Sequence, residues 1–210
     1  MDQAVSDAAR IAAGDDRVRY DTPAMALHWI TAGLVVTLWL LAQAWGFLKS
    51  GSPPRHALQA VHISLGLALI LVLAMRIFWR LGPGRRVPPA GTGLIEQGAR
   101  AVHVVLYVLL IGVVPAGLVN IWAQHDKLTF FWLFSIAMPH RPDHAVAKTV
   151  DAVHWWIATT ILILAGVHAL AALFHHYVLR DDVLLRMLPG PRARRAEAAA
   201  PPPPGAPPGR

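Results

Sequence analysis

Four long apolar stretches constrain the fold of this chain more than any other feature. They cover residues 22–48, 56–81, 101–125 and 152–179. The first contains no Asp, Glu, Lys or Arg, and the second contains none before Arg76. The hydrocarbon core of a bilayer is about 30 Å thick, so a helix needs roughly 20 apolar residues to cross it. The sequence therefore predicts an all-α fold, an integral-membrane four-helix bundle.

The composition supports a membrane protein and limits its cofactor chemistry. Only 15% of the 210 residues are charged, whereas soluble domains carry about 25%. The mean hydropathy is +0.46. Cysteine is absent, which excludes disulfides, thiolate zinc sites, iron–sulfur clusters and covalently attached c-type haem.

The segments around the apolar stretches divide the chain into three parts. Residues 1–19 lack the apolar core of a cleaved signal peptide, so they are interpreted as a flexible arm. Residues 191–210 are rich in Pro and Ala and are predicted to form a disordered tail. Residues 20–190 would form the membrane domain. Within them, the aromatic-rich run 128–138 is too short to span a bilayer, and we expect it at the interface, with Trp132 at headgroup level.

The distribution of basic residues predicts the orientation of the chain. With four spans, both termini and the loop between spans two and three share one side, which holds 14 of the 19 Lys and Arg residues. The positive-inside rule makes that side, and both termini, cytoplasmic. The excess of basic residues is thus explained by the orientation of the chain in membrane lipid, and a nucleic-acid partner is not expected.

Histidines inside the spans are the main functional candidates, because an ionisable residue is costly within a membrane. One isolated His could simply hydrogen-bond between helices. Setting aside the histidines at or near the ends of the apolar stretches, five lie within the spans proper: His28, His62, His103, His154 and His168.

The spacing of four of these histidines predicts two layers. His154 and His168 are 14 residues apart, which is about 21 Å of helical rise within roughly 40° of one face. His28 lies about 10 Å from the cytoplasmic end of span one, and His62 about 10 Å from the outer end of span two. An axial shift of span four by about 7 Å would bring His154 level with His62 and His168 level with His28.

Paired histidines at two depths suit two six-coordinate haems in the core of a bundle. Without cysteine these haems would be b-type. Ligation on both sides leaves no open position for oxygen, which favours electron transfer. Zinc would require three or four ligands that converge on one point.

Other polar residues leave alternatives open. His103 could replace His28 as a ligand, but it lies three residues into the predicted span, and we interpret it as a surface or quinone-site residue. His175 and His176 are expected to form a polar cap near a haem propionate. Arg76 and Arg80 are ordinary positive-inside anchors, and a weaker hypothesis pairs one of them with a propionate. The remaining histidines lie in or beside loops and are expected to be solvated.

Short motifs in order along the chain resemble the bacterial cytochrome b-561 family. The resemblance extends from about residue 19 to 189 and rests on Met-Ala-Leu-His-Trp at 25–29, Val-His-Ile-Ser-Leu-Gly at 61–66, Val-His-Val-Val-Leu-Tyr at 102–107, Gly-Val-His-Ala at 166–169, and His-His-Tyr at 175–177 followed by Leu-Leu-Arg-Met-Leu-Pro at 184–189.

The resemblance implies a multi-pass di-haem cytochrome of the bacterial inner membrane that exchanges electrons with the quinone pool. It places the haem ligands at His28, His62, His154 and His168, and implies two haem b and a bound ubiquinone. One version of the activity is superoxide oxidation coupled to ubiquinone. The alternatives are a haem-carrying anchor subunit for a separate dehydrogenase or hydrogenase, and a non-haem transporter. A homo-oligomer is compatible with all of these.

Overall fold

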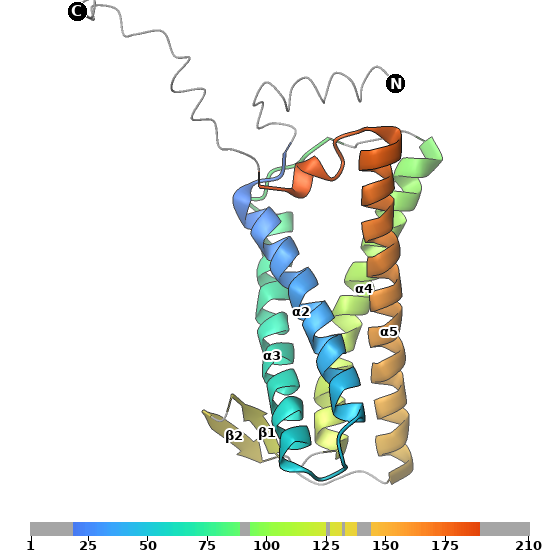
Figure 1. The fold of residues 1–210 in the computed structure, drawn as a ribbon. Helices are drawn as coiled ribbons and strands as arrows, with labels where there is room; N and C mark the ends of the chain where they lie inside the picture. The colour runs from blue at the N-terminus through green and yellow to red at the C-terminus, as the bar shows by residue number, and fades with distance from the viewer. Residues whose placement is uncertain (1–18, 89–92, 125–126, 132, 138–143, 190–210) are drawn as a thin grey trace, which may run out of the picture.

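The computed structural model describes residues 19–88, 93–124, 127–131, 133–137 and 144–189. The described residues contain four long helices that run up and down as a bundle (Figure 1), and each is long and apolar enough to cross a membrane. They are α2 (Thr22–Gly46), α3 (Pro53–Leu81), α4 (Gly93–Gln124) and α5 (His144–Phe174). The predicted four-helix membrane fold is confirmed. The predicted arm and tail lie outside the described residues, apart from Arg19.

Two of the helices begin earlier than the apolar pattern predicted. Helices α4 and α5 each start eight residues before the predicted span. The first turns of α4 are amphipathic, with an ion pair of 2.7 Å between Glu96 and Arg100 at positions i and i+4. Such pairs stabilise exposed helical turns, so these helices continue beyond the apolar stretch that marks the membrane core.

Asp21 joins the start of α2 to the end of α3. Its carboxylate accepts the N–H of Ala24 at 3.0 Å, which caps α2. The same carboxylate accepts the indole N–H of Trp79 and the backbone N–H of Arg85, each at 3.0 Å. At the other end of this helix pair, the Arg55 guanidinium donates to the carbonyl of Trp45 at 3.0 Å. Side chains thus satisfy backbone groups that helix ends leave free.

The interior consists of two helix pairs around a small apolar layer. Helix α2 packs mainly on α3, and α4 mainly on α5, while the two pairs contact each other more sparsely. The buried cluster consists of Leu73, Leu110 and Ile161, one each from α3, α4 and α5, with Val35 of α2 packed against it. This layer lies at the middle of the bundle.

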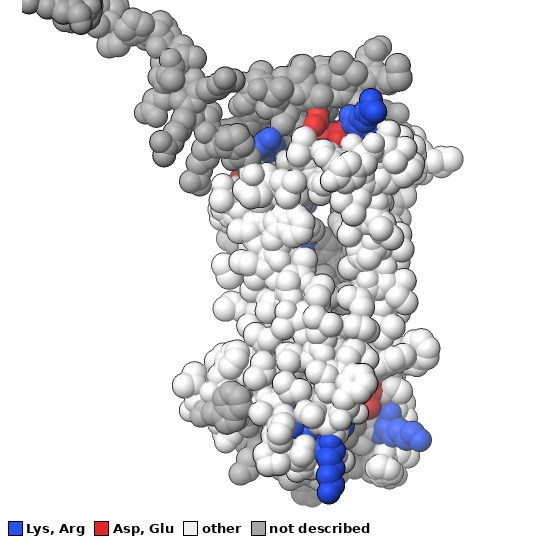
Figure 2. Space-filling view, viewed as in Figure 1, with Lys and Arg blue, Asp and Glu red and all other residues white. Residues whose placement is uncertain are grey.

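The outer surface of the bundle is apolar along its length. Leu40, Leu71 and Leu170 expose 54%, 64% and 66% of their surface. In the view of Figure 2, charged side chains gather mainly at the two ends, and residues other than Lys, Arg, Asp and Glu, drawn in white, cover most of the belt between them. An exposed apolar belt of this size fits lipid rather than water.

The segment between α4 and α5 contains a feature that the all-α prediction missed. Strands β1 (Lys127–Phe130) and β2 (Phe134–Ala137) form an antiparallel hairpin. The run is too short for a long helix and is rich in aromatic and β-branched residues, which favour strands. The N–H of Phe131 donates to Oγ of the fully buried Ser64 at 2.7 Å, which attaches the hairpin to α3. Trp132, expected at headgroup level, lies outside the described residues.

The first and last described segments lie at one end of the bundle. After α5, a π-helical turn, η2 (His175–Leu179), and a 3-10 turn, η3 (Leu185–Met187), lead the chain back towards α2. The N–H of Tyr20 donates to the carbonyl of Arg186 at 3.2 Å, and the indole of Trp29 donates to the carbonyl of Met187 at 2.7 Å. That this end is cytoplasmic stays a prediction.

Candidate functional site

The structure brings the four predicted ligand histidines together as two pairs. The ring centroids of His28 on α2 and His168 on α5 are 6.3 Å apart. Those of His62 on α3 and His154 on α5 are 6.4 Å apart. Because 14 residues of α5 separate His154 from His168, the pairs differ by about 21 Å in depth. We call them the inner pair (His28, His168) and the outer pair (His62, His154).

The separation within each pair matches that of two imidazoles bound to one metal. Imidazole nitrogen binds a first-row metal such as zinc at about 2.0 Å, and a ring centroid lies roughly 1.2 Å behind that nitrogen, so two rings on opposite sides of one ion are about 6.4 Å apart. Both pairs have this separation. Among the described residues, no group of three or more His, Asp or Glu side chains is arranged to hold a metal ion, so each pair would need further donors from a cofactor to complete a metal site.

The outer pair has a hydrogen bond that orients one of its rings. Nδ1 of His62 lies 3.0 Å from the carbonyl oxygen of Leu38. A carbonyl can only accept, so Nδ1 carries the proton and Nε2 is left with a free lone pair. This arrangement is typical of histidines that bind metals. The indole of Trp45 packs edge-on against the same imidazole, with centroids 5.0 Å apart.

The inner pair has a cationic neighbour. A guanidinium nitrogen of Arg76 lies 2.9 Å from Nδ1 of His28. Because a guanidinium only donates, Nδ1 accepts here and the proton of a neutral His28 is on Nε2. The Arg76 guanidinium also lies 5.2 Å from the ring centroid of Tyr107. Arg76 is therefore part of the inner layer.

Arg80 and the two histidines after α5 have other partners. The Arg80 guanidinium lies over the ring of Tyr20, 5.7 Å from its centroid. Nδ1 of His175 contacts the carboxylate of Asp181 at 2.5 Å, within the stretch where the backbone turns at the π-helical segment. His176 packs against Tyr177, with centroids 4.9 Å apart. The expected propionate cap at these two histidines stays a prediction.

The expectation that His103 lies shallower than the inner pair is wrong. Its ring centroid is 5.0 Å from that of His168, so it belongs to the same layer. The physical reason is the early start of α4 at Gly93, which places His103 about 15 Å from the helix start. At 5.0 Å the two rings are closer than the roughly 6.4 Å that a shared metal requires, which favours His28 as the partner of His168.

An apolar layer separates the two histidine pairs. Ile161 is seven residues from both His154 and His168, and Leu110 is seven residues after His103. Both belong to the buried cluster at mid-depth. The bundle thus contains, in order of depth, an outer polar pair, an apolar filling and an inner polar cluster. This order suits two redox centres held apart in a medium that excludes water.

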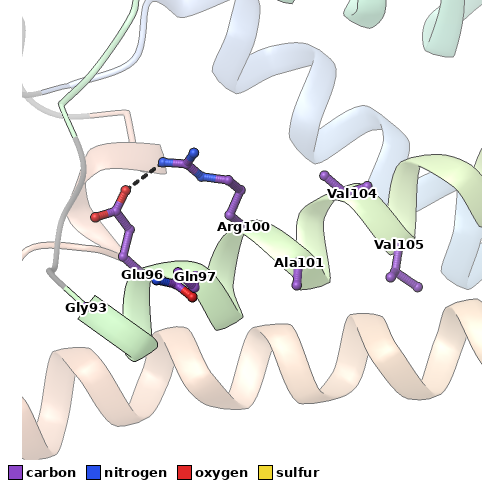
Figure 3. Close-up of a pocket in the computed structure, with 7 residues that line it drawn as sticks. All are labelled: Gly93, Glu96, Gln97, Arg100, Ala101, Val104 and Val105. Carbon is purple, nitrogen blue, oxygen red and sulfur yellow. Dashed lines mark hydrogen bonds and ion pairs between the residues drawn. The ribbon is translucent and has the colours of Figure 1, made fainter.

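A separate groove of about 570 Å³ lies along the first turns of α4 (Figure 3). Its lining includes the Glu96–Arg100 ion pair, with Val104 and Val105 further along the helix, and contains no histidine. It is therefore distinct from the two paired sites.

Trp45 and the Leu38 carbonyl contact His62, and Tyr107 contacts Arg76, but none of the three was assigned a role in the site from the sequence. Trp45 and Tyr107 lie in apolar stretches in which aromatic residues are common. The Leu38 contact is made by the backbone, which carries no sequence signal. Only their depth, level with His62 and His103, could have indicated them.

Known proteins match this chain over most of its length. The family model described as prokaryotic cytochrome b561 matches residues 19–190. A probable superoxide oxidase, CybB, of Yersinia pestis is 31% identical over 178 residues, which are 83% of this chain and 98% of that protein. Cytochrome b561 homolog 2 of Escherichia coli K12 is 29% identical over 171 residues, 81% and 91% of the two chains. Cytochrome b562 of Cereibacter sphaeroides is 31% identical over 168 residues, 78% and 91% of the two chains.

Proposed function

Because the chain belongs to the prokaryotic cytochrome b561 family and is a multi-pass membrane protein that binds haem b, we propose that it holds two haems and transfers electrons between a donor and the quinone pool. One observation carries the proposal: two facing histidine pairs, at 6.3 and 6.4 Å, on either side of an apolar layer. Membership of a haem-protein family disfavours the non-haem transporter.

In this proposal His28 and His168 would hold the inner haem, and His62 and His154 would hold the outer haem. Haem supplies one-electron redox chemistry, and the protein sets its position and potential. His62 is oriented by its bond to the Leu38 carbonyl. The apolar cluster around Leu110 excludes water between the two sites.

Arg76 is proposed to bind a haem propionate at the inner site. Its guanidinium lies among the inner histidines, and no described carboxylate is recorded as its partner. If Nε2 of His28 held the haem iron, the ring proton would be on Nδ1, and Nδ1 could not accept from Arg76. The guanidinium is then free for a carboxylate, with which it forms strong paired hydrogen bonds. Arg80, over Tyr20, is assigned no such role.

The donor proposed for the reaction is superoxide, with ubiquinone as the acceptor. One relative carries the name probable superoxide oxidase. Two superoxide anions would be oxidised to two molecules of oxygen, and one ubiquinone would take up two electrons and two protons to give ubiquinol. The positive-inside rule places the end with Asp21 in the cytoplasm, and we propose the bacterial inner membrane as the location.

Stopped-flow mixing tests this function. The purified protein is mixed with a superoxide source, and haem reduction is followed optically before and after addition of ubiquinone. We expect fast reduction by superoxide, with reoxidation when ubiquinone is present. If neither molecule changes the haem spectrum, while a soluble redox subunit co-purifies and reduces the haem, the protein is an anchor subunit for a separate dehydrogenase or hydrogenase.

A further inference from the structure

Gly117 on α4 lies against the imidazole of His154. A Cβ placed on Gly117 would be 3.1 Å from Cε1 and 3.5 Å from Nδ1 of that ring. The first distance is shorter than ordinary van der Waals contact, so any larger residue would displace the imidazole. Gly117 is 14 residues after His103, the same spacing as that between His154 and His168. It therefore lies level with the outer pair.

The contact involves the bare backbone of α4 rather than another side chain. Nδ1 of His154 is buried and has no well-formed hydrogen bond, and its polar neighbour is the backbone carbonyl of Val113, one turn before Gly117. Residues four apart share one face of a helix. This face of α4 thus offers the ring a carbonyl at one turn and the space of a missing Cβ at the next.

We propose that Gly117 is a positioning residue for the outer haem: it lets the His154 imidazole lie against the backbone of α4, with Nε2 turned towards His62. The inference rests on the proposed function and adds a residue to it. His62 is oriented by the hydrogen bond that it donates to the Leu38 carbonyl of α2. The Val113 carbonyl beside Nδ1 of His154 is not in well-formed hydrogen-bond geometry, so the close packing of Gly117 restricts the orientation of this ring as well. Ligands held within a few tenths of an ångström are what a metal site requires.

Gly112 provides a matched control on the same helix. It lies five residues before Gly117, and a Cβ placed there would meet nothing within 4 Å. Substitution of either glycine changes the helix propensity of α4 equally. Only the change at Gly117 crowds a candidate ligand.

The test compares Gly117→Val, Gly117→Ala and Gly112→Val by haem content and by the low-spin EPR signals of the oxidised protein. We expect the haem content of the Gly117→Val protein to be one per chain instead of two. Its inner EPR signal should be retained, which would show that the bundle is intact. Gly117→Ala should keep both haems but shift the outer EPR signal, and Gly112→Val should match the wild type.

Three results would overturn the inference. The first is a Gly117→Val protein with both haems and unchanged signals, and the second is equal haem loss at Gly112 and Gly117. If the Gly117→Val protein loses both haems, the Gly117→Ala protein is used to decide. A Gly117→Ala protein whose outer EPR signal is not shifted is the third result that would overturn the inference. A wild-type protein with fewer than two haems would contradict the proposed function itself, and it is recognised without any variant.

Discussion

At the scale of single residues, the two candidate sites differ in the groups that surround their histidines. His62 in the outer pair donates to a neutral carbonyl, while the inner layer contains the Arg76 cation beside His28. A nearby positive charge favours the reduced state of a redox centre, because reduction adds an electron. In the proposed two-haem arrangement, the inner haem is therefore expected to have the higher midpoint potential.

Removal of the Arg76 charge should lower the potential of one haem selectively. We expect Arg76→Gln to lower the inner midpoint potential by roughly 60 mV, about 1.4 kcal/mol for a one-electron couple, as a charge at short range and intermediate dielectric would do. Redox titration of the spectrum measures this. Arg80→Gln is the control and should have a smaller effect, since Arg80 packs over Tyr20. Equal shifts in the two variants would contradict a specific role for Arg76.

At the scale of helices, Asp21 is the connection whose loss is most easily measured. Burial alone would raise the pKa of its carboxyl, but the hydrogen bonds from Arg85, Trp79 and Ala24 outweigh burial and hold that pKa below its ordinary value. A carboxyl with a lowered folded-state pKa stabilises the protein above its unfolded-state pKa. That stabilisation is lost as pH falls through the folded-state value, which lies below about pH 4.

Asp21→Ala should therefore destabilise the bundle by about 1–2 kcal/mol at pH 7, a typical cost for a lost helix cap. Thermal unfolding in detergent measures the difference, which should shrink as the pH is lowered below about 4. Asp21→Asn keeps one acceptor oxygen, so its stability should lie between that of the wild type and that of Asp21→Ala. If Asp21→Ala unfolded at the same temperature as the wild type at pH 7, Asp21 would not stabilise the contact between α2 and α3.

The helices and the pairing of the histidines could be predicted from the sequence, but their surroundings could not. The length of an apolar run and the rise per residue are local properties, and they identify the four spans and the levels of His62 and His154. The start of α4 depends on polar turns outside the apolar run, so the depth of His103 was missed. The hairpin depends on a contact between Phe131 and Ser64, 67 residues apart, which no local pattern reveals.

At the scale of the whole molecule, the fold is a stack of layers across a membrane. Lipid covers the outside, the paired histidines occupy two depths, and the apolar cluster around Leu73 and Leu110 lies between them. The two helix pairs contact each other sparsely, and the proposed haems would lie between them at the depths of the two histidine pairs. This arrangement gives a place to five of the eleven histidines of the chain.

The haem content of purified variants tests the central claim most directly. A pyridine haemochrome assay, with protein determined independently, should give two b-type haems per chain for the wild type. Substitution of His28 or His154 with Ala should each leave one low-spin haem, because each change removes one ligand from a different pair, whereas His103→Ala should keep two. A wild-type protein with one haem, or a His103→Ala variant that loses a haem while His28→Ala retains both, would contradict the two-pair account.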